Sequence, residues 1–201
     1  ALNDTYDLIE AEGLPQAAVL PFDLESEDEN LFIELTQLIG THFGHLDGAL
    51  LNASVLGQRT MLDNYHWDTW QKVMKINVNG QFLLTKHLIP LLREAPADAS
   101  LIYTTSSVGR EGRAYWGAYS VSKFATEGLM QVAAQELENT SNIRVNCINP
   151  GATRTGMRAS AYPAENPATV KPASEIMDLY LHLMSPASIG THGQSLDAQP
   201  K

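Results

Sequence analysis

Tyr119 and Lys123 stand four residues apart in the stretch YSVSK. On a helix this spacing places both side chains on one face, within reach of each other. A free phenol has a pKa of about 10, and a nearby ammonium group favours the phenolate and lowers that value. The pair could therefore act as a general acid and base at neutral pH. By itself it is weak evidence, because many ordinary helices carry a tyrosine and a lysine at this spacing.

A serine near the end of an apolar run could supply a second group for the same chemistry. Ser106 lies thirteen residues before Tyr119 and shortly before Gly109. The ends of parallel strands present catalytic groups, and a hydroxyl there can stabilise the charge that develops on a carbonyl oxygen during reduction. Ser107 is the rival candidate, but Ser106 has the better spacing to both Gly109 and Tyr119.

Asn77, in KINVNG, lies inside a long predicted helix, where asparagine is an indifferent helix former. Its presence there indicates a local kink or a task for its amide group. Asn79 stands two residues later and competes for the same assignment.

The apolar patterns predict that strands and helices alternate and so bring these residues together. Helices are predicted over residues 1–12, 25–43, 67–93, 117–139 and 173–184, and strands over 17–24, 46–54, 100–107 and 143–151, with a last apolar stretch near 195–198. The helix at 67–93 should kink near Pro90. The acidic run 25–29 is interpreted as a solvated helix start, which suits the helix dipole. The alternation is typical of an α/β fold with a mostly parallel sheet covered on both faces. The segment 156–172 is either a substrate lid or a plain surface connection.

Composition indicates one soluble domain over residues 1–201. The chain has a mass of 22.0 kDa, with 44% hydrophobic and 18% charged residues. A net charge of −10 argues against a nucleic-acid partner. No apolar run approaches the roughly 20 residues that span a bilayer, and no secretory signal is visible, so no membrane partner is expected. Cys147 is the single cysteine, which favours a reducing, cytoplasmic setting.

The other reactive side chains are weaker candidates. His42 and His45 lack acidic or cysteine partners and are expected at the surface, and no histidine shows the spacing of a metal site, so no metal is predicted. Cys147 is interpreted as a core residue. Among the tryptophans, Trp116 is the one that could touch a substrate, because it lies close before Tyr119.

Five motifs together resemble the short-chain dehydrogenase/reductase family. They are LNAS (51–54), NVNG (77–80), SSVG (106–109), YSVSK (119–123) and NPGATRT (149–155). The resemblance covers roughly residues 14–199. Within that family, SSVGREGRAYWGAYSVSKFATEG, RVNCINPGATRTGMRAS and LDAQP resemble the bacterial YciK-type oxidoreductases.

The resemblance implies a Rossmann-like, doubly wound parallel sheet and an oxidoreductase that interconverts a carbonyl and an alcohol. The implied cofactor is NADP or NAD, with NADP slightly favoured, and the implied partner is a small-molecule substrate. It also implies a homo-oligomer, a dimer or tetramer, in which the helices at 67–93 and 117–139 pair between subunits.

The resemblance also implies a role for each matching residue. Tyr119 would exchange the proton at the substrate oxygen, and Ser106 would orient and polarise the carbonyl. Lys123 would lower the tyrosine pKa and hold the nicotinamide ribose, while Asn77 would hold the water of a proton relay. The implied cofactor-binding residues, besides Tyr119 and Lys123, are Asp23, Leu24, Asn52, Ala53, Ser54, Pro150, Gly151, Thr153 and Thr155. Asp23 and Leu24 match the pair at the adenine, and residues 52–54 match a loop lining the cofactor. The segment at the nicotinamide carboxamide is matched by Pro150, Gly151, Thr153 and Thr155. Ser54 replaces the usual glycine, so the backbone approach there is expected to be less close.

The family's first unit is a strand, a Gly-rich turn and a helix that hold the cofactor's pyrophosphate. These 201 residues contain no G-x-x-x-G-x-G upstream of the strand predicted at 17–24, and the region that selects NAD or NADP is expected to be absent with it. That strand would then lack an inner neighbour, and the strand at 46–54 would present an exposed edge. The residues could be part of a longer polypeptide, another chain could supply the strands, or the chain could be a truncated relative. We favour the first explanation, because all the catalytic positions are retained.

Two other functions stay open. A non-catalytic interaction protein could retain the fold, and binding and turnover of a nicotinamide cofactor would distinguish it from an enzyme. An epimerase or dehydratase could reuse the tyrosine and lysine, but the roughly 50 residues after Pro150 are few for the larger substrate domain of those enzymes.

Overall fold

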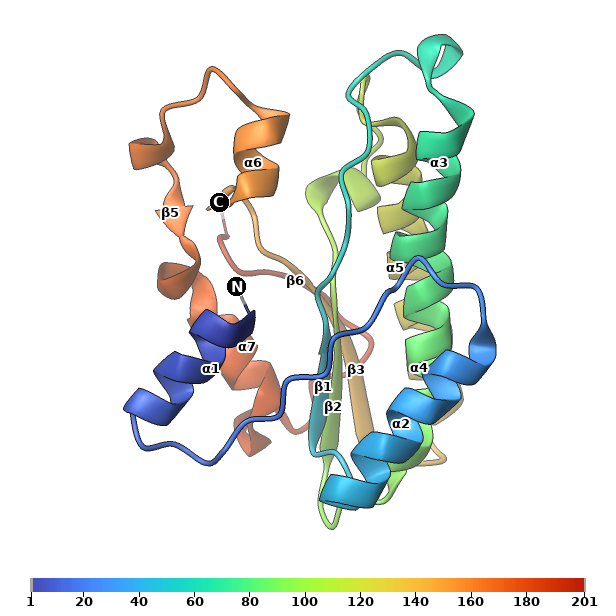
Figure 1. Cartoon of the computed structure of the whole chain (residues 1–201), viewed down its shortest axis with the longest axis vertical. Helices are drawn as coiled ribbons and strands as arrows, with labels where there is room; N and C mark the ends of the chain where they lie inside the picture. The colour runs from blue at the N-terminus through green and yellow to red at the C-terminus, as the bar shows by residue number, and fades with distance from the viewer. Residues whose placement is uncertain (1, 201) are drawn as a thin grey trace.

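A parallel four-stranded sheet stands between two layers of helices (Figure 1). The computed structural model describes residues 2–200. The strands follow the spatial order β1 (Gly48–Leu51), β2 (Ala99–Thr104), β3 (Ile143–Asn149) and β6 (Ser195–Asp197). One layer contains α2 (Glu29–Phe43), α3 (Trp67–Met74), α4 (Gly80–Arg93) and α5 (Gly117–Leu137), and the other contains α1 (Leu2–Ala11) and α7 (Met177–Met184). Beyond the end of β3 lie β4 (Thr153–Arg154), α6 (Gly156–Ala161) and β5 (Lys171–Pro172).

The core lies on both faces of the two central strands. Every residue of β2 and β3 is buried, as expected for parallel strands covered by helices on both sides. Leu101 and Val145 face a cluster with α4 and α5, whereas Ile102 and Ile148 face a second cluster with α7. The predicted doubly wound α/β fold is confirmed. Among residues 2–200, no helix is long and apolar enough to cross a membrane.

The strand predicted at 17–24 is wrong, because these residues form no strand. A strand needs a neighbour for its backbone N–H and C=O groups, and among residues 2–200 no strand pairs with this segment. Its apolar residues are held by other contacts instead. Phe22 packs edge-on against Phe32 of α2, with ring centres 4.8 Å apart. On its outer side, β1 has no strand partner within the described residues.

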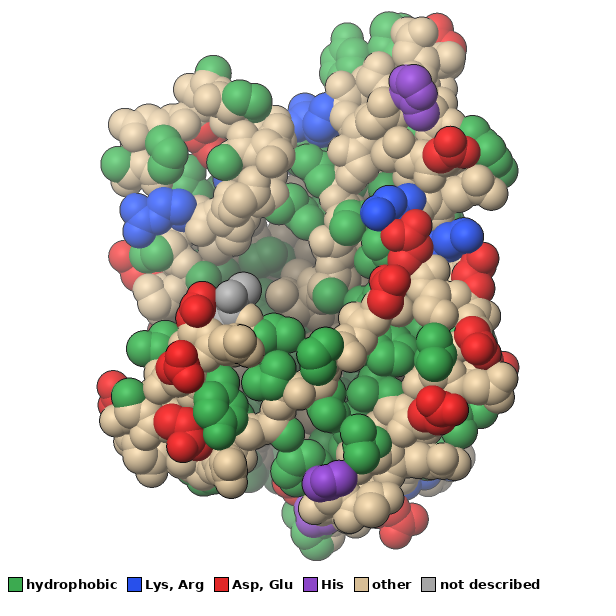
Figure 2. Space-filling view, in the orientation of Figure 1, with side chains coloured by type: hydrophobic (Ala, Val, Ile, Leu, Met, Phe, Trp, Pro, Cys, Tyr) green, Lys and Arg blue, Asp and Glu red, His purple; other side chains and the backbone are tan. Residues whose placement is uncertain are grey.

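Residues 25–28 of the acidic run precede α2, and Glu29 is the first residue of that helix. Asp28 caps the helix by accepting the Asn30 N–H at 3.0 Å. The neighbouring carboxylates form ion pairs with the layer beneath, and Figure 2 shows acidic and basic side chains interleaved on this flank. The pairs are Glu25–Lys72 at 2.9 Å, Glu27–Lys75 at 2.9 Å and Glu29–Lys86 at 2.6 Å. The run therefore fastens the segment before α2 to α3 and α4.

The long helix predicted at 67–93 is irregular at Asn77 rather than at Pro90. A π-helical turn over Lys75–Asn79, η2, joins α3 to α4, and the Gly80 N–H donates to the Lys75 carbonyl. Helix α4 continues through Pro90 to Arg93. Such π-turns are frequent at functional sites. Asn77, which favours helices only weakly, lies within this irregular turn.

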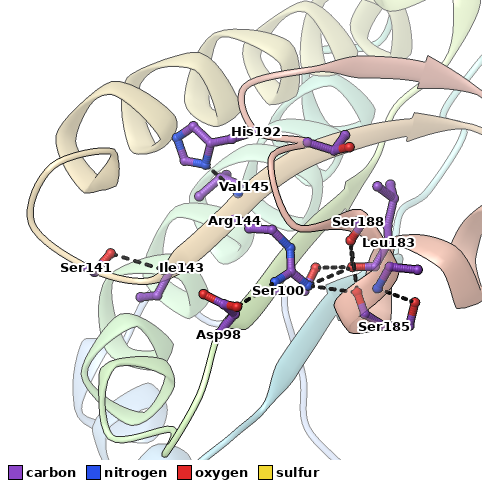
Figure 3. Close-up of polar contacts among 12 residues, drawn as sticks. Asp98, Ser100, Ser141, Ile143, Arg144, Val145, Leu183, Ser185, Ser188 and His192 are labelled. Carbon is purple, nitrogen blue, oxygen red and sulfur yellow. Dashed lines mark hydrogen bonds and ion pairs between the residues drawn. The ribbon is translucent and has the colours of Figure 1, made fainter.

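Polar contacts fix the end of α7 to the starts of β2 and β3 (Figure 3). Arg144 Nη2 donates to the carbonyls of Leu183 at 3.4 Å and Ser185 at 3.2 Å. Ser100 Oγ also donates to the Leu183 carbonyl, at 2.8 Å. This anchor lies at the end of the sheet where the strands begin, so the opposite end is free to form a site.

Candidate active site

A cavity of about 600 Å³ opens where the parallel strands end. Figure 2 shows the surface hollowed between the part that contains α6 and the edge of the sheet. Most of the predicted site residues line this cavity: Asn52, Ala53, Ser54, Ser106, Tyr119, Pro150, Gly151, Thr153 and Thr155. The structure therefore brings together residues from three strand ends and the first turn of α5.

Tyr119 and Lys123 lie on the same face of α5, beside the end of β2. The side chain of Ser106 lies beside that of Tyr119 and can donate a hydrogen bond to it. Lys123 is completely buried, and its Nζ donates to the Thr104 carbonyl at 2.7 Å. A Cβ atom on Gly109 would lie 2.8 Å from the Lys123 backbone, so glycine permits the turn after β2 to approach the helix this closely.

Burial shifts the acidity of both groups. It raises the pKa of Tyr119 to about 12, and the hydrogen bond from Ser106 opposes this only in part. This direction is opposite to the one predicted from the neighbouring ammonium group. The reason is geometric: Lys123 Nζ lies 5.6 Å from the centre of the tyrosine ring and is directed at the Thr104 carbonyl. Burial also lowers the pKa of Lys123 to about 8. At neutral pH, Tyr119 is therefore a neutral phenol beside a lysine cation.

Asn77 lies behind the cavity, with its amide group fully occupied by protein partners. Its Oδ1 accepts the Val55 N–H at 2.8 Å, and its Nδ2 donates to the Val55 carbonyl at 2.9 Å and to Ser122 Oγ at 3.0 Å. The amide joins the loop after β1 to α5 across the π-helical turn. Asn79 is exposed, so Asn77 is the candidate of the two.

Asp23 and Leu24 are not brought to the cavity. Asp23 Oδ1 accepts the Glu25 N–H at 2.9 Å. Leu24 packs on α4, where a Cβ atom on Gly80 would lie 2.9 Å from its carbonyl oxygen. Ser107 does not line the cavity either, which favours Ser106 as the candidate hydroxyl.

Several cavity residues were not predicted from the sequence. Met157, Arg158, Ala161 and Tyr162, all from the segment 156–172, line one end of the cavity. This favours a lid over a plain surface connection. Helix α6 spans 6 residues, which is too short for a helical pattern to show which side chains face inward. Trp116 lines the same end, as its position before Tyr119 suggested.

The cavity residues fit the nicotinamide end of a dinucleotide. Thr105 lines the cavity beside Ser106, and its buried hydroxyl has no hydrogen-bond partner within the described part of the chain. Buried hydroxyls are normally paired, so this one suits a polar group of a ligand. For metals, no cluster of three or more histidine, cysteine, aspartate or glutamate side chains suited to binding an ion occurs in residues 2–200.

Sequence comparison shows the family. The model of the short chain dehydrogenase family matches residues 1–166, and the chain belongs to that family. It is 52% identical over 167 residues to the uncharacterized oxidoreductase YciK of Escherichia coli (strain K12). That alignment covers 83% of this chain and 65% of the relative, so it spans slightly less than two thirds of that protein. The predicted resemblance to YciK-type oxidoreductases is confirmed.

Solved structures show the same similarity. A short chain dehydrogenase from Shigella flexneri 2a strain 301, complexed with NADP, matches with a TM-score of 0.95 and 47% identity, covering 99% of this chain and 82% of that one. A short chain dehydrogenase from Escherichia coli CFT073, complexed with NADPH, matches with a TM-score of 0.95 and 46% identity, at the same coverage of 99% and 82%.

Proposed function

We propose that this protein is an NAD(P)(H)-dependent oxidoreductase that interconverts a carbonyl compound and an alcohol, with Tyr119 as the general acid and base. One observation carries the proposal: a buried, protonated phenol lies beside Ser106 and Lys123 at the wall of a cavity. Two similar solved structures are complexed with NADP or NADPH, which favours NADP over NAD.

The direction of the Tyr119 pKa shift suits reduction. The nicotinamide, when bound, supplies the hydride to the carbonyl carbon. Ser106 donates a hydrogen bond to the substrate oxygen and stabilises the charge that develops there. The Tyr119 hydroxyl then transfers its proton to that oxygen. The proton transfer is favourable because an alkoxide is a stronger base than even a phenolate of raised pKa.

We assign the nicotinamide end of the cofactor to the cavity. Lys123 and Tyr119 would hold the ribose, and the loop 52–54 would line the cofactor. Pro150, Gly151 and the threonines at 153 and 155 would contact the carboxamide. Asp23 and Leu24 remain the proposal for the adenine end on sequence resemblance alone, since neither lines the cavity.

We propose further that the protein is a cytoplasmic homo-oligomer. Phe82 on α4 and Val121, Phe124 and Val132 on α5 are large apolar side chains that are 43–54% exposed. Exposed apolar side chains on these two helices suit pairing with a second copy. The buried thiol of Cys147, the single cysteine, fits a reducing compartment.

The proposal is tested by cofactor titration followed by turnover. We expect NADPH fluorescence to change on addition of the protein, with weaker binding of NADH, and we expect NADPH oxidation with at least one member of a panel of ketones and aldehydes. If nicotinamide fluorescence does not change and no carbonyl is reduced, the enzyme assignment is wrong. That outcome would favour the non-catalytic interaction protein.

A further inference from the structure

A stack of cations and aromatic rings closes one end of the cavity. The guanidinium carbon of Arg59 lies 4.1 Å from the Trp116 ring centre and 5.3 Å from the Tyr162 ring centre. The guanidinium carbon of Arg158 lies 3.8 Å from the Tyr162 ring centre. Trp116 and Tyr162 themselves have ring centres 6.0 Å apart. The stack therefore joins the loop after β1, the start of α5 and the end of α6, which are separate in the sequence.

Arg59 depends on the two rings for most of its contacts. Its Nη1 donates to the Ala161 carbonyl at 2.6 Å. Its Nε is buried and lacks a hydrogen-bond partner, and no carboxylate forms an ion pair with it among residues 2–200. A cation–π contact is stronger the further the cation is removed from water. Arg59 does not line the cavity, so its visible task is to hold the two rings and α6 in place.

The backbone beside Trp116 is arranged for this contact. Tyr115 has a φ of 72°, unusual for a residue with a side chain, and Gly117 has a φ of 28°. A Cβ atom on Gly117 would lie 2.6 Å from the ring of Tyr65. The hydroxyl of Tyr65 accepts the Gln58 N–H at 3.0 Å, next to Arg59. The loop that carries Arg59 is thus fastened to the start of α5 independently of the stack.

The rings form the wall closest to the proposed chemistry, and that wall presents no free charge. Trp116 and Tyr162 both line the cavity, and the Trp116 ring centre lies 5.8 Å from that of Tyr119. Among residues 2–200, Arg158 is the single charged residue in the lining. Its Nε and Nη2 are both bonded to the Glu165 carboxylate, at 2.7 and 2.6 Å, which neutralises it. The surface that Trp116, Met157, Ala161 and Tyr162 present to an acceptor is therefore aromatic and apolar.

We infer, resting on the proposed function, that Arg59 is a positioning residue that holds Trp116 and Tyr162 together as one wall of the acceptor site. The acceptor that fits this wall is an uncharged, apolar carbonyl compound. A charged acceptor would lose its hydration here without gaining an opposite charge.

The kinetic test compares Arg59→Met with wild type, using methylcyclohexanone as the acceptor. We expect KM to rise about tenfold, with kcat within about twofold and NADPH affinity unchanged, because the wall loosens while the reacting groups stay in place. Arg59→Lys keeps the charge but loses the planar stacking on the rings. Its KM should therefore lie between those of wild type and Arg59→Met. Arg93→Met, at the exposed end of α4, controls for loss of an arginine. An unchanged KM in Arg59→Met would overturn the assignment to Arg59.

A second readout is independent of activity. Trypsin should cleave after Arg158 several times faster in Arg59→Met than in wild type or Arg93→Met, because α6 has lost its link to the loop after β1. Equal cleavage rates in variants that melt like wild type would also overturn the role of Arg59.

The acceptor class is tested on the wild-type protein with two matched ketones, methylcyclohexanone and the oxocyclohexanecarboxylate of the same ring. We expect kcat/KM to favour the uncharged ketone by about tenfold or more. Equal or better use of the carboxylate would overturn the assignment of an uncharged acceptor. If neither these ketones nor the wider panel causes NADPH oxidation, the proposed function fails, while the trypsin comparison still decides the role of Arg59.

Discussion

At the scale of single residues, burial controls the two central groups. Tyr119 loses solvent and its pKa rises to about 12, and Lys123 loses solvent and its pKa falls to about 8. The lysine holds its charge at neutral pH against this burial, with one carbonyl as its hydrogen-bond acceptor. The proposed catalytic pair, Tyr119 and Lys123, therefore lowers the stability of the folded protein, as is common where polar groups are retained for catalysis.

Replacing Lys123 with methionine should reveal how much the buried lysine lowers the stability of the fold. Between about pH 8 and pH 10.5 the unfolded chain binds more protons at this position than the folded protein, so wild-type stability rises with pH through that window. Lys123→Met lacks this rise. We expect the variant to be more stable than wild type by about 2 kcal/mol at pH 7, after allowing for the lost hydrogen bond, and the difference to shrink towards pH 10.5.

Urea denaturation at pH 7, 9 and 10 measures this difference, with the exposed Lys171→Met as the control. A variant that is less stable than wild type at pH 7, or a difference that stays constant with pH, would contradict the burial argument.

At the scale of elements, local patterns predicted most of the helices and strands, because helical and strand periodicities are properties of short segments. Asn77 marked the irregular turn correctly, since a poor helix former inside a helix signals one. The strand at 17–24 failed, because strand formation depends on a neighbour that the local sequence does not describe. The contact of Arg59 with Trp116 and Tyr162 was equally beyond prediction, as it joins distant segments through the fold.

Asn77→Ala tests whether the π-helical turn exists to place this amide. The change removes one buried and two partly buried hydrogen bonds and leaves both polar backbone groups of Val55 without a partner. We expect a loss of about 2–4 kcal/mol in the free energy of unfolding, together with weaker NADPH binding as the loop after β1 loosens. Thermal and urea denaturation measure the first effect and fluorescence titration the second. The exposed Asn142→Ala should stay within about 0.5 kcal/mol of wild type, and a similarly small effect at Asn77 would refute this role.

At the scale of the whole molecule, the two ends of the sheet differ. The polar contacts to α7 lie where the strands begin, and the proposed active-site cavity lies where they end. Figure 1 shows α4 and α5 in the helix layer on one face of the sheet, away from α6 and α7. Their exposed apolar side chains therefore lie on a different side of the molecule from the proposed acceptor site. Pairing of subunits through these helices would leave the cavity accessible.

Phe124→Glu should prevent this pairing, because the 46% exposed ring would be replaced by a charge that must be desolvated in the interface. Light scattering during size-exclusion chromatography should show wild type as a dimer or tetramer and the variant as a smaller species. Leu38→Glu, an equally exposed apolar position on α2, is the control and should leave the mass unchanged. A wild-type monomer, or an unchanged mass in Phe124→Glu, would exclude this interface.

The most direct test of the central claim is the rate of NADPH oxidation by Tyr119→Phe with a carbonyl that wild type reduces. Tyr180→Phe is the matched control, because Tyr180 lines the same cavity and is also buried. Removing the proton donor should lower kcat, measured at saturating NADPH, by about a hundredfold or more, while Tyr180→Phe stays within about threefold of wild type. A Tyr119→Phe protein that binds NADPH and retains a rate close to that of wild type would contradict the account.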